Sequence, residues 1–241
     1  MATLFSNNTT PGYYRTSNIF PEAAEIVFKV LYVVVAGLGL AGNSFIMYMF
    51  SSKRVEVSPF NVLLLNLSIS DAIAAISILP YVFIDLRQLR GMSQRTANVV
   101  CVLSMGQSAY WLAVVASTFT LFVISISRYL FIHYPLKARF FNEKHASLII
   151  IGVIWPVAVA LGVPNFLSLH YDPDYAVCKR VWPSYFNGTV FSSVTALLGF
   201  VLPVVVMIFT FVATRRYLWQ NKSSRHAVPL TREQVFKIFH H

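Results

Sequence analysis

Five long apolar stretches, separated by short polar segments, dominate the pattern along the chain. They cover residues 26–50, 59–84, 97–130, 146–167 and 190–213. A helix of about 20 residues crosses the hydrocarbon core of a bilayer, and each stretch reaches that length. The apolar runs are continuous rather than alternating, which excludes a membrane β-barrel. The pattern predicts an all-α integral membrane helical bundle. Its parts would be an N-terminal segment (1–25), a transmembrane bundle (26–214) and a polar C-terminal segment (215–241).

Composition also indicates a membrane protein. The 241 residues are 56% hydrophobic and 12% charged, with a mean hydropathy of +0.63, whereas a soluble domain usually carries about 25% charged residues. The formal net charge is +10, but the charges lie in the gaps between apolar stretches. That placement is typical of signals that orient a membrane protein, so we expect membrane lipids and no nucleic acid as partners.

Basic residues indicate which side of the membrane each polar segment occupies. Lys and Arg are about twice as frequent after the first, third and fifth stretches as in the other polar segments, which places the N-terminus outside the cell. Glycosylation sequons at Asn7, Asn8 and Asn187 fall outside in this topology. We therefore expect a multi-pass glycoprotein with an extracellular N-terminus.

Asp71 is the one acid deep inside an apolar stretch. A centred Asp costs about 2.5–3.5 kcal/mol on insertion scales, so it needs a compensating environment. One interpretation is a cation or proton site that faces a polar cavity, and the other is a structural pair with a neighbouring helix. Asn43 and Asn66 are candidate partners, because their amides can hydrogen bond with a carboxylate.

One face of the third stretch carries residues that could serve both ends of the bundle. Its positions recur at steps of four and three, which places them on one stripe of a helix. From Tyr110 to Arg128 the stripe is about 27 Å long. It could contact a ligand at one end and an internal partner at the other, or serve only helix packing. The stripe comprises Tyr110, Val114, Ser117, Leu121, Ile124 and Arg128.

Two residues in the fourth and fifth stretches predict features of helix packing. Pro203 lacks an N–H and leaves the carbonyl of Gly199 without its usual donor, so we expect a kink there. Trp155 lies in the middle of its stretch, away from the interfacial belt that tryptophan prefers. We expect this side chain to pack between helices.

The chain has two cysteines, Cys101 and Cys178. Both fall outside in the predicted topology, where the environment is oxidising, so we expect a disulfide between them. The bond would hold the loop before the fifth stretch over the end of the bundle. The alternative is two unpaired thiols.

The sequence contains no motif that indicates catalysis. Residues 37–42 match G-x-G-x-x-G, but they lie inside the first apolar stretch, without the preceding strand that a dinucleotide site requires. Zinc-protease, serine-hydrolase and P-loop motifs do not occur. We therefore predict that the protein is not an enzyme.

In order along the chain, the motifs resemble those of a rhodopsin-like (class A) G-protein-coupled receptor. Each motif alone is common, but every stretch contributes to the match, which covers residues 26–215. The motifs are Gly42-Asn43, Asn66-Leu67-Ser68-Ile69-Ser70-Asp71, Ser127-Arg128-Tyr129, His133-Tyr134-Pro135-Leu136, Trp155, Pro203 and the two cysteines. The resemblance implies five transmembrane helices of a seven-helix receptor fold, located in the plasma membrane.

The resemblance also implies roles for individual residues. An allosteric sodium ion, with Asp71 as its metal ligand, would bind in a polar core of Asn43, Asp71 and Ser117. Contacts with a heterotrimeric G protein would come from Arg128, Tyr129, Pro135 and Leu136. The ligand pocket would include Tyr81, Asp85, Tyr110 and Trp111. An extracellular ligand would then shift a helix-bundle equilibrium that the G protein reads.

Four departures from the family pattern modify these expectations. Ser127 replaces the acid that pairs with the neighbouring arginine, so the inactive state would be held less firmly. Phe211 replaces a tyrosine whose hydroxyl helps the active state. Cys101 lies two positions further from Arg128 than usual, so we expect the outer end of the third span to be irregular. Tyr110 stands where amine receptors carry an Asp, which favours a peptide or another small non-amine ligand.

The largest departure is length, because the spans that carry C-W-x-P and N-P-x-x-Y are missing. We expect that the chain as given cannot signal, and that it is a fragment, an incomplete gene model or a truncated isoform. The main hypothesis is a receptor sequence. The alternatives are a non-signalling isoform that associates with full-length receptors, and a membrane transporter. A transporter should show repeated halves or matched broken helices, and neither is visible.

Overall fold

The computed structural model describes residues 12–14, 22–52, 58–84, 86–105, 107–134, 138 and 145–226. Within these residues, five helical spans are long and apolar enough to cross a membrane, which confirms the predicted helical bundle. The spans are Ile26–Ser51, Pro59–Phe83, Gln94–His133, Ala146–Ser168 and Gly188–Gln220.

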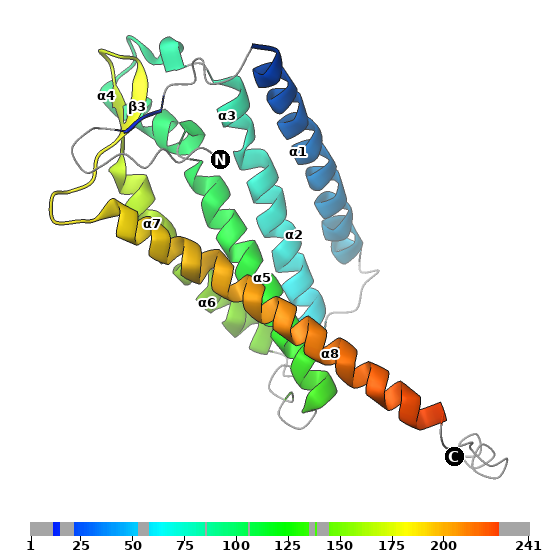
Figure 1. Cartoon of the computed structure of the whole chain (residues 1–241). Helices are drawn as coiled ribbons and strands as arrows, with labels where there is room; N and C mark the ends of the chain where they lie inside the picture. The colour runs from blue at the N-terminus through cyan, green and yellow to red at the C-terminus, as the bar shows by residue number, and fades with distance from the viewer. Residues whose placement is uncertain are drawn as a thin grey trace.

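Two spans are single helices and three are composed of several segments (Figure 1). The helices are α1 (Glu22–Ser51), α2 (Pro59–Ser77), α3 (Leu79–Phe83), α4 (Gln94–Val100), α5 (Ser108–His133), α6 (Ala146–Ser168), α7 (Gly188–Ala196) and α8 (Leu202–His226). The shorter turns are the 3₁₀ helix η1 (Leu86–Leu89) and the π-helical segments η2 (Cys101–Met105) and η4 (Leu197–Val201). The strands are β1 (Gly12–Tyr14), β2 (Leu169–Asp172) and β3 (Val177–Arg180).

Local sequence signals set the start of α2 and its boundary with α3. The Ser58 hydroxyl accepts a hydrogen bond from the Asn61 N–H at 3.2 Å, and Pro59 occupies the first turn, where its missing N–H costs nothing. Pro80 lies in the first turn of α3 and lacks the N–H that a continuous helix would use. The second span therefore divides at Ile78.

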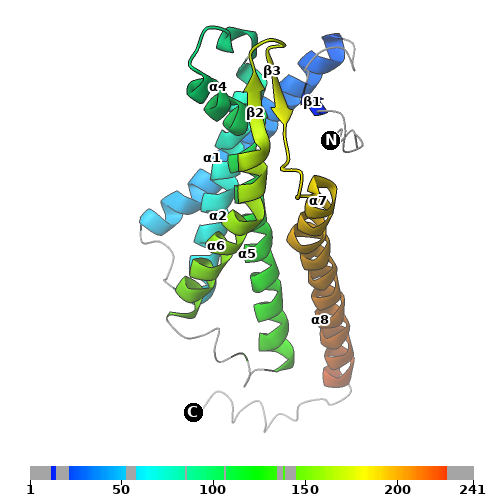
Figure 2. The same ribbon diagram turned by 90° about the vertical axis from the view of Figure 1, so that its left-hand side faces the viewer.

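α5 is the central helix of the bundle. It packs against α2, α6 and α8, and Figure 2 shows it between α6 and α8. Ala113 and Ala116 are completely buried on it, since small side chains let neighbouring membrane helices approach closely. On the α6 side, Val115 and Ala116 form an apolar cluster with Ile154 and Ala158.

The third span begins irregularly, as expected, whereas near Pro203, where the sequence predicted a kink, the structure has a π-helical turn. η2 is π-helical, and Gln107 just after it has a left-handed φ of 46°, so the start of the third span is irregular, as the cysteine spacing predicted. In the fifth span, π-helical η4 ends two residues before Pro203, and the Leu202 N–H bonds to the Leu197 carbonyl. The chain thus accommodates the proline with a widened turn, a common device around such interruptions.

A small antiparallel sheet covers one end of the bundle (Figures 1 and 2). The strand order is β1-β3-β2, with Cys178 of β3 opposite Tyr14 on one side and Tyr171 on the other. We call this the disulfide end of the bundle and the opposite one the Arg128 end. The sequence pattern did not predict these strands, because segments of three or four residues are too short to show an alternating pattern.

Candidate functional site

A disulfide joins Cys101 of η2 to Cys178 of β3, as predicted. The two Cα atoms are 5.8 Å apart, and both side chains are completely buried. They lie in an apolar cluster with Leu89, Ala97, Leu169 and Tyr171. The bond therefore anchors the β2–β3 hairpin to the outer part of the third span.

Polar contacts hold the same hairpin in place. The Gln94 side chain donates to the Tyr171 carbonyl, and the Tyr171 N–H donates to the Asn98 side chain, each at 2.8 Å. Across the hairpin, the Lys179 ammonium lies 3.0 Å from the Asp172 carboxylate. Its hydrogen bond lowers the pKa of Asp172 below the ordinary value. Because the pKa is lowered, this pairing is present at neutral pH and is lost only as the pH falls through the lowered pKa.

Aromatic side chains from four elements gather toward the disulfide end. Tyr32 of α1 contacts Tyr81 of α3 edge to face, with ring centroids 6.2 Å apart. Tyr110 and Trp111 of α5 are 5.4 Å apart, and Trp111 contacts Phe200 of η4 at 6.0 Å. These rings include three of the four residues expected in a ligand pocket. The fourth, Asp85, lies outside the described residues.

A second aromatic group lies where the chain enters α7. Trp182 stacks on Phe186, with centroids 5.1 Å apart and planes at 19°, and both rings contact Phe191. The Asn187 side chain caps α7 by accepting hydrogen bonds from two backbone N–H groups, and it is exposed. Gly188 follows, and a Cβ on it would come within 2.3 Å of the Trp182 indole nitrogen.

Gly188→Ala is therefore expected to displace Trp182 from its stack on Phe186. The cost in unfolding free energy should be about 1 kcal/mol, at the lower end for overpacking, because the ring lies in a loop that can shift. Tryptophan fluorescence and thermal unfolding of the purified protein measure both effects. The control is Gly152→Ala in α6, where a Cβ would meet nothing within 4 Å. Equal spectra and melting temperatures for the two variants would contradict the prediction.

Asp71 faces the interior of the bundle, as expected. The Ser117 hydroxyl of α5 donates to its carboxylate at 2.6 Å. The expected partnership with Asn43 is not found, since that amide donates to the Gly39 carbonyl of its own helix at 2.9 Å. Asp71 and Ser117 supply two oxygen atoms of the kind that hard cations prefer. This pair therefore has the oxygen chemistry of part of a cation site, while the Asn43 amide bonds within its own helix.

Asn66 serves a different set of helices from Asp71. Its amide donates to the Thr120 hydroxyl of α5 at 2.8 Å and accepts from the Trp155 indole of α6 at 3.0 Å. Five positions on a helix correspond to a turn of about 140°, so Asn66 and Asp71 point in different directions. The sequence suggested Asn66 as a partner for Asp71, and the structure instead makes it the junction of α2, α5 and α6. Trp155 packs between helices, as predicted.

At the Arg128 end, aromatic contacts connect α5 with α8. The His133 ring lies 4.4 Å from Tyr129 and 4.4 Å from Tyr217 of α8, measured between centroids. One helical turn deeper, the hydroxyls of Ser125 and Thr210 are 2.7 Å apart. Tyr129, which was expected to contact a G protein, therefore takes part in the α5–α8 interface. Pro135 and Leu136 lie outside the described residues, as do Asn7 and Asn8.

Arg128 is exposed, and its guanidinium carbon lies 4.0 Å from the centroid of the Phe60 ring of α2. The neighbouring Ser127 is buried, and its hydroxyl donates to the Ile124 carbonyl at 2.9 Å. The sequence predicted that Ser127 leaves the arginine without its acid. It gave no indication of Phe60, which is distant in the chain and carries no charge.

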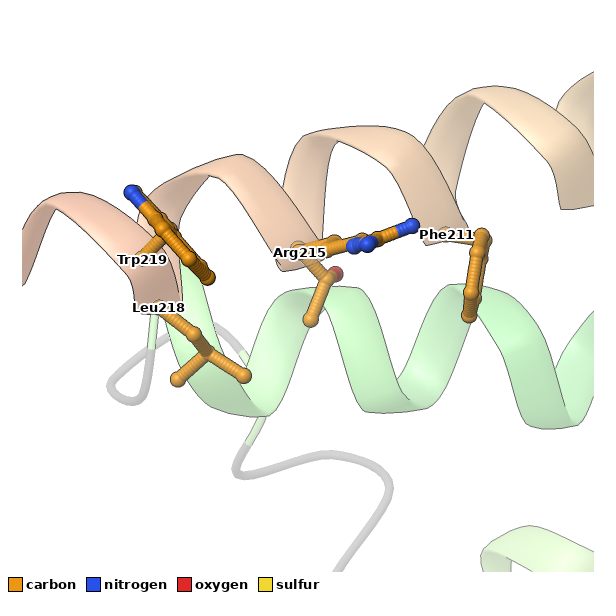
Figure 3. Close-up of a pocket in the computed structure, with 5 residues that line it drawn as sticks. Phe211, Arg215, Leu218 and Trp219 are labelled. Carbon is orange, nitrogen blue, oxygen red and sulfur yellow. The ribbon is translucent and has the colours of Figure 1, made fainter. Parts of the chain in front are cut away.

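An open pocket of about 360 Å³ lies along the part of α8 near the Arg128 end. Figure 3 shows Phe211, Arg215, Leu218 and Trp219 projecting from successive turns of α8, with the α5 ribbon alongside. The pocket is lined mainly by apolar atoms and by one cationic side chain. It lies away from the aromatic cluster at the disulfide end.

Together these features define a multi-pass membrane helix bundle with a disulfide-anchored hairpin at one end and an exposed arginine at the other. The family model for the 7 transmembrane receptor (rhodopsin family) matches residues 42–238. The chain belongs to this family, which consists of receptors rather than enzymes.

Several known receptors are similar to the chain. Galanin receptor 2b of Danio rerio is 27% identical over 217 residues, which cover 88% of this chain and 56% of that receptor. The pyroglutamylated RF-amide peptide receptor of Rattus norvegicus is 23% identical over 84% of this chain and 47% of its own length. The RYamide receptor of Drosophila melanogaster is 28% identical over 82% of this chain and 43% of its own length. The chain thus spans about half the length of these relatives.

Proposed function

We propose that the chain is part of a receptor for a peptide, which transmits an extracellular signal to a heterotrimeric G protein across the plasma membrane. The observation that carries the proposal is the arrangement along α5. Tyr110 and Trp111 lie in the first turn of α5, where Trp111 contacts Phe200, and Arg128 is exposed near the opposite end of the same helix. A ligand that binds at one end can then shift the conformational equilibrium of the bundle, and a partner bound at the other end responds to that shift.

A peptide is the ligand class that best suits the disulfide end. The relatives are named as receptors for galanin and for RF-amide and RYamide peptides. Tyr110 offers an aromatic ring and a hydroxyl where amine receptors carry a carboxylate, so a protonated amine lacks its usual counter-ion. In this orientation the N-terminus and the hairpin are extracellular, and Asn7, Asn8 and Asn187 are candidate glycosylation sites.

A sodium ion is proposed as an allosteric ligand of the polar core. Asp71 and Ser117 would supply oxygen ligands, and the ion would add a positive charge beside a half-buried carboxylate among the helices. Asp71 lies on α2 and Ser117 on α5, so the hydrogen bond between them already couples the two helices.

The functional test uses this chain completed to seven spans and expressed in cells. Amidated and free-acid peptides are screened for G-protein nucleotide exchange. We expect a peptide to stimulate exchange and to lose potency in a Tyr110→Ala variant, with Tyr185→Ala, an exposed residue outside the aromatic cluster, as the control. Stimulation by amines alone, or equal peptide potency in both variants, would contradict the proposal.

Ser127→Asp is expected to lower ligand-free nucleotide exchange. The new carboxylate would lie beside Arg128 and hold it by an ion pair. Because the Arg128 side chain is exposed to water, the pair should contribute at most about 1 kcal/mol, and the decrease should be no more than about fivefold. Ser127→Asn is the neutral control of similar size. Equal basal exchange in the two variants would count against a loosened inactive state.

A non-signalling isoform is the second candidate. Such a chain would associate with full-length receptors and retain them inside the cell. Sequencing of the mature message decides between the two candidates. Two further apolar spans downstream of His241 would support the complete receptor, whereas a stop codon at that point would support the isoform.

A further inference from the structure

The Arg128 guanidinium lies over an aromatic ring rather than beside an acid. Its central carbon is 4.0 Å from the Phe60 centroid, well inside the range of about 6 Å for a cation–π contact. No Asp or Glu placed by the structure forms an ion pair with Arg128. Phe60 lies in the first turn of α2 and is half-buried, so the contact joins the ends of α2 and α5.

Ser127 does not take over the role of a counter-ion. Its hydroxyl bonds back to the Ile124 carbonyl of its own helix. Ser127 and Phe60 instead line a small space of about 20 Å³ between α2, α5 and α6. Phe60 therefore lies next to the position where the family pattern has an acid, with one ring face available to the arginine.

We propose that the Phe60 ring replaces the missing carboxylate and holds the Arg128 guanidinium in the inactive receptor. Phe60 is then a positioning residue that acts through Arg128. The functional part of this inference rests on the proposed coupling to a G protein, whereas the contact itself does not. A guanidinium is weakly hydrated and stacks well on aromatic faces, so the ring can hold it without a buried negative charge.

The contact is tested directly on the 241-residue chain in lipid nanodiscs. Nuclear magnetic resonance of labelled arginine should show ring-current shifts for the Arg128 guanidinium. We expect Phe60→Leu to abolish the shift and Phe60→Trp to preserve it. The matched control is Phe131→Leu, because Phe131 lines the same small space but does not stack on Arg128. An Arg128 signal unchanged by Phe60→Leu would overturn the proposal, whether or not the receptor couples to a G protein.

The consequence for signalling is tested by a double-mutant cycle on the full-length receptor. Phe60→Leu should raise ligand-free nucleotide exchange about two- to fivefold, the effect of losing an exposed cation–π contact. Phe60→Trp keeps an aromatic face for the arginine and should not raise exchange. In a Ser127→Asp background, where a carboxylate holds the arginine, Phe60→Leu should have little effect. A general packing defect would raise exchange equally in both backgrounds, and that result would overturn the proposal.

Failure of the proposed function has a different signature. The wild-type receptor would then show no exchange with any G protein or peptide, and no variant would change that. The Arg128 resonance would still shift between wild type and Phe60→Leu if the ring holds the guanidinium. The two failures are therefore distinguishable in the same set of variants.

Discussion

Replacing Cys178 with serine is expected to have the largest effect of any single substitution at the disulfide end. The closed loop has a sequence separation of 77 residues, for which a free chain would lose about 4.5 kcal/mol of stabilisation. Membrane helices already restrict the unfolded chain, so we expect a smaller loss, about 2 kcal/mol. Thermal unfolding in nanodiscs measures it.

The same variant should also detach the hairpin from η2 and expose the cluster around Leu169 and Tyr171. Peptide binding to the full-length receptor should fall with it. The control is the Cys101→Ser/Cys178→Ser double variant, which should lose no more stability than either single variant because one bond is removed in each case. An unchanged melting temperature in all three variants would contradict a stabilising role for the disulfide.

Asn66→Leu is the second substitution with a large expected effect. It removes the hydrogen bonds to Thr120 and Trp155 at once and leaves the indole N–H without a partner. Hydrogen bonds between membrane helices average about 0.6 kcal/mol, with a maximum near 1.7, and an orphaned donor adds to the loss. We expect a total of about 1–3 kcal/mol, measured by thermal unfolding in nanodiscs.

Asn43→Leu is the matched control, because the Asn43 amide bonds only within α1. It should cost clearly less than Asn66→Leu. Thr120→Val and Trp155→Phe each remove one of the two hydrogen bonds. Their losses of unfolding free energy should lie between those of Asn43→Leu and Asn66→Leu. Equal losses for the two asparagine variants would show that Asn66 does not join the three helices.

The transmembrane architecture could be predicted from sequence because bilayer thickness fixes the length of an apolar helix. The interior position of Asp71 could be predicted for a similar reason, since a carboxylate in lipid is costly. In both cases one strong physical effect acts on residues that can be recognised directly in the sequence. The irregular start of the third span was predicted differently, from the spacing of Cys101 and Arg128 compared with the family pattern.

The remaining features depend on contacts between distant segments. Phe60 approaches Arg128 only because α2 and α5 pack together, and nothing in the sequence around Phe60 marks it as a cation partner. Asn43 and Asn66 were predicted as partners of Asp71 because amides hydrogen bond with carboxylates. In the structure Asn43 bonds to its own helix, and Asn66 points in another direction from Asp71 and bonds to Thr120. Strand β1 pairs with β3 of the hairpin although most of the chain separates them in sequence. Hydrophobic periodicity cannot indicate such a distant pairing.

The central claim is that the chain crosses the membrane five times with an extracellular N-terminus, and epitope tags at the two ends of the chain test both points. An odd number of crossings places the ends on opposite sides of the membrane. We predict that antibody stains the N-terminal tag on intact cells and the C-terminal tag only after permeabilisation. Staining of both tags on the same side would contradict five crossings, and a reversed pattern would contradict the orientation on which the proposed receptor function rests.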